Sequence, residues 1–146
     1  MPPPSFVGSE QCIQCHETEA MAWRGSHHDL AMAEASENKM LGDFNNAEFT
    51  AHGVTSVFYR KGADFFVRTD GPDGKLHHYR IAYTFGWHPL QQCLIKFRNG
   101  HIQALGIAWD SRPREAGGQR WFHLYPNEQM DYRHPQHRTA RDQNWN

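Results

Sequence analysis

The sequence predicts an α+β fold, with a short helical segment at the N-terminus, an antiparallel β meander of about five strands and a long loop-rich C-terminal region. Residues 1–45 contain two stretches rich in helix-forming residues, and residues 54–109 alternate short β-branched or aromatic runs with turn residues. Residues 110–146 show neither the 3.6-residue period of a helix nor the alternation of a strand. At 146 residues and 38% hydrophobic content, we expect these three parts to form a single domain, 1–146.

The N-terminal segment is expected to hold two helices. Ser9 is a candidate N-cap for a helix over residues 10–24, which contain no Gly or Pro. Gly25 interrupts this stretch. A second short helix is expected over residues 28–41, which are rich in Ala, Glu, Met and Leu, and it would end at Gly42.

The middle of the chain predicts strands separated by turns. The expected strands cover residues 55–60, 64–69, 75–85, 92–97 and 101–109. Asn99-Gly100, between the last two, is a strong hairpin signal. The residues from Asp110 onward are expected to form an ordered loop region, with aromatic packing anchors at Trp109, Trp121, Phe122 and Tyr125.

Charge and hydropathy exclude several classes of partner. With 15 basic and 16 acidic residues the formal net charge is −1, so the chain has no general attraction for polyanions, and nucleic acid is not an expected partner. No apolar run approaches the ~18–20 residues of a transmembrane helix. The opening "MPPPSF" lacks the charged and apolar parts of a secretion signal, so we expect a mature or truncated N-terminus.

Cys12, Cys15 and His16 form a C-x-x-C-H motif, the signature of covalent haem attachment. Two thiols about one helical turn apart can reach the two vinyl groups of one porphyrin as thioethers. The imidazole of the next residue then lies under the iron as the proximal ligand. The motif therefore predicts one haem c and its iron.

Other uses of these three residues remain open. A structural zinc site needs four ligands, often from a second closely spaced pair, and only Cys93 and scattered histidines are available. A thioredoxin-like redox pair follows a strand, and no strand is expected before Cys12. The cysteines could also stand beside the histidine by chance. Cys93, within an expected strand, is interpreted as a buried inert thiol.

The ligand on the other side of an iron at His16 has three candidates: His27, His28 and Met32. On one straight helix, His16 and His28 would lie about 18 Å apart at ~1.5 Å per residue, whereas two axial nitrogens on one iron lie roughly 4 Å apart. The break at Gly25 would have to fold the chain back over the haem. Alternatively, the histidine serves a different haem.

With these residues in place, the stretch "FVGSEQCIQCHETEAMAWRGSHHDLAM" resembles the N-terminal part of multihaem c-type cytochromes of the cytochrome c-554-like family. The shared pattern is C-x-x-C-H followed by W-x-x-S-x-H, filled here by Trp23, Ser26 and His28. In that family the last histidine is commonly an axial ligand, so the resemblance selects His28 over His27.

Later segments, "YTFGWHPLQQCLIKF", "QALGIAWDSRP" and "RWFHLYP", look like the β-rich section of large periplasmic members of that family. There "RDQNWN" leads into a further C-x-x-C-H, so the resemblance implies an N-terminal fragment of a larger multihaem protein. Only one C-x-x-C-H is present in this chain.

The resemblance implies an electron carrier, not a catalyst in isolation. Its haem would be tethered by Cys12 and Cys15 and its iron bound by His16 and His28, with other haem domains or redox proteins as partners. Thioether attachment implies a periplasmic or extracellular location in a bacterium. Two alternatives remain: a haem-dependent oxidoreductase domain with an open axial position, and a β-rich interaction module stabilised by zinc.

Overall fold

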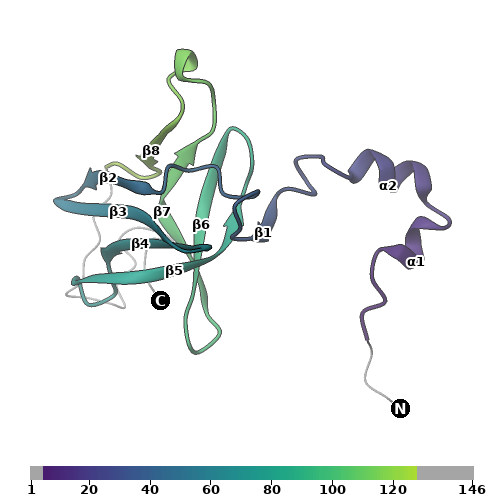
Figure 1. The fold of residues 1–146 in the computed structure, drawn as a ribbon, viewed down its shortest axis with the longest axis horizontal. Coiled ribbons are helices and arrows are strands. Elements are labelled where there is room, and N and C mark those ends of the chain that lie inside the picture. The colour runs from purple at the N-terminus through teal and green to yellow at the C-terminus, as the bar shows by residue number, and fades with distance from the viewer. Residues whose placement is uncertain (1–4, 128–146) are drawn as a thin grey trace.

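The computed structural model describes residues 5–127 and is dominated by one antiparallel sheet (Figure 1). Its strands are β1 (Met32–Glu34), β2 (Asn45–Ala51), β3 (Val54–Lys61), β4 (Asp64–Asp70), β5 (Leu76–Phe85), β6 (Leu90–Lys96), β7 (Ile102–Asp110) and β8 (Arg120–His123). From β2 to β8 each strand pairs with the next along the chain, and the sheet curls into a nearly closed barrel. Strand β1 pairs separately with β5. We call this sheet and its loops the body.

The predicted α+β class is wrong, because the described residues are mostly β. The helical elements of residues 5–127 are α1 (Glu10–Ile13), α2 (Glu17–Trp23) and the single 3-10 turn η1 (Arg114–Ala116). The helix expected over residues 28–41 is not formed. Its Met, Ala and Glu at 32–34 pair instead with residues 83–85 of β5, so tertiary hydrogen bonding overrides the local helix preference.

The expectation of a long loop-rich region after Asp110 is also wrong. Residues 120–123 form β8, which pairs with residues 107–110 of β7. This strand is short and lacks clear alternation, so its pattern is visible only once β7 provides a partner. The part of that expectation covering residues 128–146 lies outside the described residues.

The five strands expected between residues 54 and 109 are confirmed as β3 to β7. Their turns follow the expected chemistry: Gly62 and Gly100 have φ angles of 60° and 83°, which glycine adopts without steric cost. Two further strands, β2 and β8, extend this meander at its ends.

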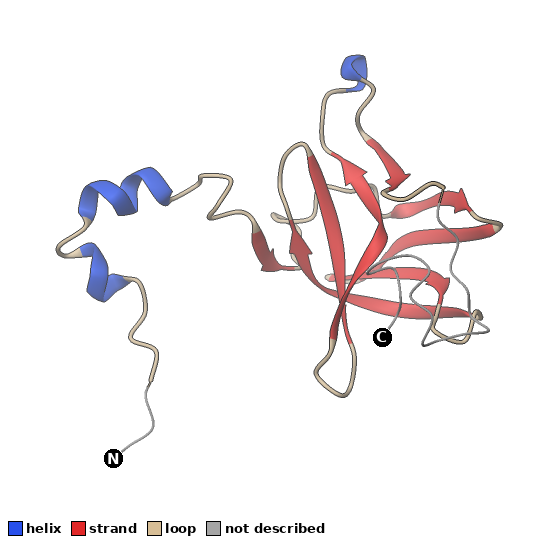
Figure 2. Cartoon of the chain, turned by 180° about the vertical axis from the view of Figure 1, so that it is seen from behind, coloured by secondary structure: helices blue, strands red, loops and turns tan. Residues whose placement is uncertain are grey.

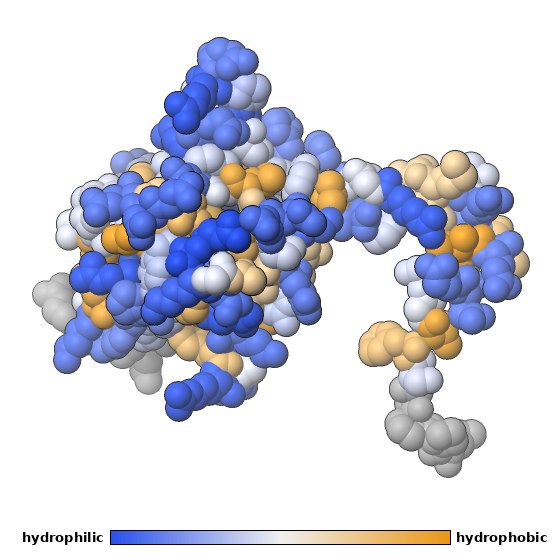
Figure 3. All heavy atoms as spheres, viewed as in Figure 1, coloured by the Kyte–Doolittle hydropathy of each residue, from blue (hydrophilic) through white to orange (hydrophobic). Residues whose placement is uncertain are grey.

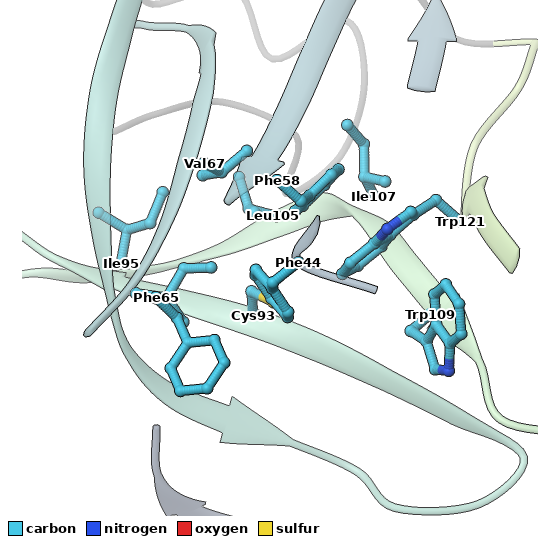
Figure 4. Packing of buried hydrophobic residues seen from close by; sticks show 11 residues of the cluster. Phe44, Phe58, Phe65, Val67, Cys93, Ile95, Leu105, Ile107, Trp109 and Trp121 are labelled. Atoms are coloured by element: carbon cyan, nitrogen blue, oxygen red, sulfur yellow. The ribbon is translucent and has the colours of Figure 1, made fainter. Parts of the chain in front are cut away.

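Alternation along the strands places one set of side chains inside the barrel. In β4, Phe65, Val67 and Thr69 are buried, whereas Phe66 and Arg68 between them are partly exposed. The resulting apolar cluster contains Phe44, Phe58, Phe65, Val67, Ile81, Cys93, Ile95, Leu105, Ile107, Trp109 and Trp121 (Figure 4).

Aromatic rings dominate the packing of this core. The Phe58 ring stacks on Trp121 with centroids 3.7 Å apart, and Phe44 meets Trp121 edge to face at 5.5 Å. The Trp121 indole N–H donates to the carbonyl of Asp43 at 3.1 Å. The expected anchors Trp109 and Trp121 are therefore confirmed, whereas Tyr125 is 41% exposed.

Residues 5–31, which we call the arm, project away from the body and carry both α-helices (Figures 1 and 2). Neither α1 nor α2 contains a buried residue. The arm joins the body through β1 and through the Gly86 N–H, which donates to the Ala31 carbonyl at 2.7 Å. No helix within residues 5–127 has the length and apolar character needed to cross a bilayer.

Candidate functional site

The C-x-x-C-H motif lies at the bend between α1 and α2. Cys12 belongs to α1, Cys15 follows it, and His16 is the N-cap residue of α2. The carbonyl of Cys12 accepts hydrogen bonds from the N–H groups of Cys15, at 3.2 Å, and His16, at 3.0 Å. The single helix expected over residues 10–24 is therefore two helices, and the bend holds the two thiols and the imidazole within one turn of backbone.

All three side chains of the motif are exposed, and neither thiol of the bend forms a disulfide. Exposed thiols can react with an external group without unfolding the chain. Glu17 and Glu19 lie in the first turn of α2, where negative charge stabilises the positive end of the helix dipole. The local sequence thus supports a short helix that starts directly after the motif histidine.

The W-x-x-S-x-H pattern forms the turn that ends α2. Gly25 has a φ of 72° directly after the C-cap, and the Ser26 N–H donates to the Trp23 carbonyl at 3.0 Å. The side chain of Ser26 accepts from the Asp29 N–H at 3.3 Å, and a carboxylate oxygen of Asp29 accepts from the Gly25 N–H at 2.8 Å. The serine therefore has a structural role, and the turn displays His28 on its exposed surface.

His16 and His28 lie beyond opposite ends of α2. Its seven residues span about 10 Å along the helix axis at ~1.5 Å per residue. Helix α2 therefore separates the backbones of these two predicted ligands. Met32 lies farther along the chain, in β1, and pairs with Phe85 on β5.

The side chain of His27, which the motif pattern does not select, lies near the body. Its ring centroid is 6.0 Å from that of His88 in the loop between β5 and β6. A second pair of histidines, His52 and His123, meets edge to face at 4.8 Å. Burial, with a smaller effect of neighbouring His52, lowers the pKa of His123. Sequence reasoning missed both pairs, because their members are far apart in the chain.

The arm leaves an unusual amount of apolar surface uncovered. Phe6, Val7, Met21 and Trp23 are all more than half exposed, and Figure 3 shows this apolar surface on the arm, away from the body. Isolated exposed apolar residues are normal, but here Phe6 and Val7 precede α1, Met21 and Trp23 lie on α2, and neither helix contains a buried residue. A large apolar ring such as a porphyrin, bound at the C-x-x-C-H bend, would pack against part of this surface. The donor set and this surface therefore fit a c-type haem.

The described residues show less support for zinc. Within residues 5–127, no group of three or more His, Cys, Asp or Glu side chains is arranged to hold a metal ion. Cys93, the third thiol, is 1% exposed, and burial raises its pKa to about 12. This confirms the interpretation of Cys93 as a buried inert thiol, which is a poor candidate for a metal ligand.

Comparison of the chain with protein families, with curated proteins and with solved structures found no match. The cytochrome resemblance accordingly stands on the motif residues alone.

Proposed function

We propose that this chain is an electron-transfer domain carrying one covalent haem c on its arm. Cys12 and Cys15 form the thioether tethers, His16 is the proximal iron ligand and His28 is a second iron ligand. The observation that carries the proposal is an exposed C-x-x-C-H bend on two short helices that bury nothing and leave apolar side chains uncovered. The proposed partners are other haem domains or redox proteins, in the periplasm or outside a bacterial cell.

Side chains of the arm would set the environment of this group. A bound haem supplies a one-electron iron couple whose potential depends on ligands, burial and nearby charge. Trp23 and Met21 exclude water from part of its surface. Between residues 9 and 29 there are four carboxylates and one guanidinium, and this net negative charge favours the oxidised, more positive iron. We therefore expect a lower potential than apolar burial alone would produce.

The position of His28 supports its assignment to the iron of another haem. Helix α2 separates it from His16, and the hydrogen bonds of Ser26 and Asp29 stabilise the turn in which it lies. His28 would then join the arm to a haem on a neighbouring segment or molecule. Such a ligand would couple two haems electronically without a substrate pocket.

The test is production of the chain in a periplasm that contains haem-attachment machinery, followed by intact-mass measurement and a pyridine haemochrome spectrum. We expect a covalent mass gain of one haem and a thioether-type spectrum. The matched control is Cys12→Ser/Cys15→Ser, which should show neither. An unmodified mass for the natural sequence under the same conditions would refute the proposal.

The same separation of His16 and His28 favours one second candidate, a haem-dependent oxidoreductase domain. If no histidine reaches the far side of the iron, that position is open to a small molecule. A high-spin spectrum and binding of carbon monoxide would show the open axial position that this function requires. A low-spin spectrum that becomes high-spin in His28→Ala would instead assign His28 as the sixth ligand and contradict it.

A further inference from the structure

Within the described residues, two pairs of histidines are close enough to act together, and they differ in which ring nitrogen is free. In the pair at the end of the barrel, the Nδ1 of His123 accepts a hydrogen bond from the Tyr125 N–H at 3.0 Å. The proton of neutral His123 therefore resides on Nε2, which cannot bind a metal ion in that tautomer. The other pair, His27 and His88, joins the arm to the body, and the hydrogen bonds around His88 favour the opposite tautomer for that residue.

The tautomer of His88 follows from Ser111. The Ser111 hydroxyl donates its single proton to the Trp87 carbonyl at 2.9 Å. Its oxygen also lies 3.3 Å from the Nδ1 of His88, so in this contact the oxygen accepts and Nδ1–H donates. The lone pair of His88 Nε2 is then available. Metal-binding histidines commonly have such a hydrogen bond on the nitrogen that does not bind the metal.

The distance between the rings of His27 and His88 also suits a shared ion. With metal–nitrogen bonds of ~2 Å, two imidazoles on one ion have ring centroids about 4.5 to 6.4 Å apart as the angle at the metal increases from 90° to 180°. The observed separation is 6.0 Å, with the ring planes inclined by 43°. Both side chains are exposed, so an ion can enter from solvent and keep water on its remaining positions.

We propose that His27 and His88 form a two-imidazole site for a borderline divalent transition metal such as Ni²⁺, Cu²⁺ or Zn²⁺, with Ser111 as the positioning residue of His88. Imidazole nitrogen suits these ions better than it suits Mg²⁺ or Ca²⁺. The site uses none of the residues assigned to haem, so it is independent of the proposed function.

A metal at this site would clamp the arm to the body. In the described chain the arm is held there by the short strand β1 and by the Gly86–Ala31 hydrogen bond. A bridge between His27 and His88 joins the turn after α2 to the loop between β5 and β6. It would fix the direction in which the arm, and any group attached to it, points from the barrel.

The experiment is titration of the full chain with NiCl₂ by isothermal calorimetry, in a Cys12→Ser/Cys15→Ser background that removes competing thiols and haem. We expect one site. His27→Gln and His88→Gln should each weaken binding by at least about tenfold, and Ser111→Ala by about tenfold, as for other residues that orient a metal ligand. His101→Gln, another histidine on the body, is the matched control and should remain within about twofold of the parent. Unchanged affinity in His88→Gln would overturn the proposal.

A second measurement keeps His27 and His88 intact, so its outcome does not depend on whether a substituted variant folds. Ni²⁺ is paramagnetic, so its binding broadens nearby amide signals in NMR spectra. We expect simultaneous broadening at Asp29, on the arm, and at Trp87 and Ser111, on the body. Broadening of the arm signals alone would show that the ion does not bridge the two parts and would also overturn the proposal.

Discussion

Replacing Gln91 with methionine should loosen the attachment of residues 39–41, between β1 and β2, to the barrel. Gln91 is 2% exposed, and its Oε1 accepts from the Leu41 N–H at 2.9 Å. Its Nε2 donates to the carbonyls of Lys39, at 2.9 Å, and Gly86, at 3.3 Å. Methionine has a similar length but no amide, so Gln91→Met removes all three hydrogen bonds with little change in volume.

The expected decrease in the free energy of unfolding follows from these three hydrogen bonds. A hydrogen bond contributes about 1 kcal/mol net, and a buried donor left without a partner costs about 1–3 kcal/mol. Two short bonds and one longer bond therefore predict a decrease of about 3 kcal/mol in the free energy of unfolding, a large share of the ~5–15 kcal/mol typical of a domain. For a chain of this size we expect the midpoint of thermal unfolding to fall by roughly 6–12 °C.

Urea denaturation followed by tryptophan fluorescence would measure this loss. The matched control is Gln103→Met, because the Gln103 side chain is partly exposed and both contacts of its amide are local: Nε2 donates to the Ala104 carbonyl at 3.1 Å, and Oε1 lies 3.3 Å from His101 Nε2. The control should change the free energy of unfolding by less than about 0.5 kcal/mol. Hydrogen exchange at Leu41 should also accelerate in Gln91→Met. A loss below about 1 kcal/mol, or one equal to that of the control, would refute the reasoning.

Three further predictions concern titratable groups. In haem-free native protein at pH 8, a thiol reagent should label the two arm cysteines but not Cys93, whose pKa burial raises to about 12; labelling of all three would contradict this. Burial, and to a smaller extent His52, lowers the pKa of His123 below 6.5. The contribution of neutral His123 to the free energy of unfolding is therefore complete above about pH 6.5 and is lost as the pH falls through the lowered pKa. Replacing the neighbour, in His52→Gln, should raise the pKa of His123 in a proton NMR titration. Hydrogen bonds from Arg112 hold the pKa of Asp110 at about 2. The contribution of this carboxylate to the free energy of unfolding is therefore present above pH 3.8 and is lost as the pH falls toward 2. An unchanged carbon-13 titration of Asp110 in Arg112→Gln would argue against this pairing.

The chemistry-bearing part of the candidate site could be predicted from short stretches of sequence. Cys12, Cys15 and His16 need only local spacing, and the structure places them on one exposed bend. The turn carrying His28 was marked by Gly25. The relation of the arm to the body could not be predicted in the same way, because the contact between His27 and His88 depends on how the loop after β5 folds.

The sequence by itself determined the five central strands, because alternation of apolar side chains and glycine turns act over a few residues at a time. It also determined the C-x-x-C-H motif, through spacing within one turn of backbone. Only the tertiary structure decided that residues 32–34 form a strand and not a helix, and that β2 and β8 complete a nearly closed barrel. These outcomes depend on hydrogen bonds and packing between distant segments, and such interactions outweigh local helix or loop preferences of well under 1 kcal/mol per residue.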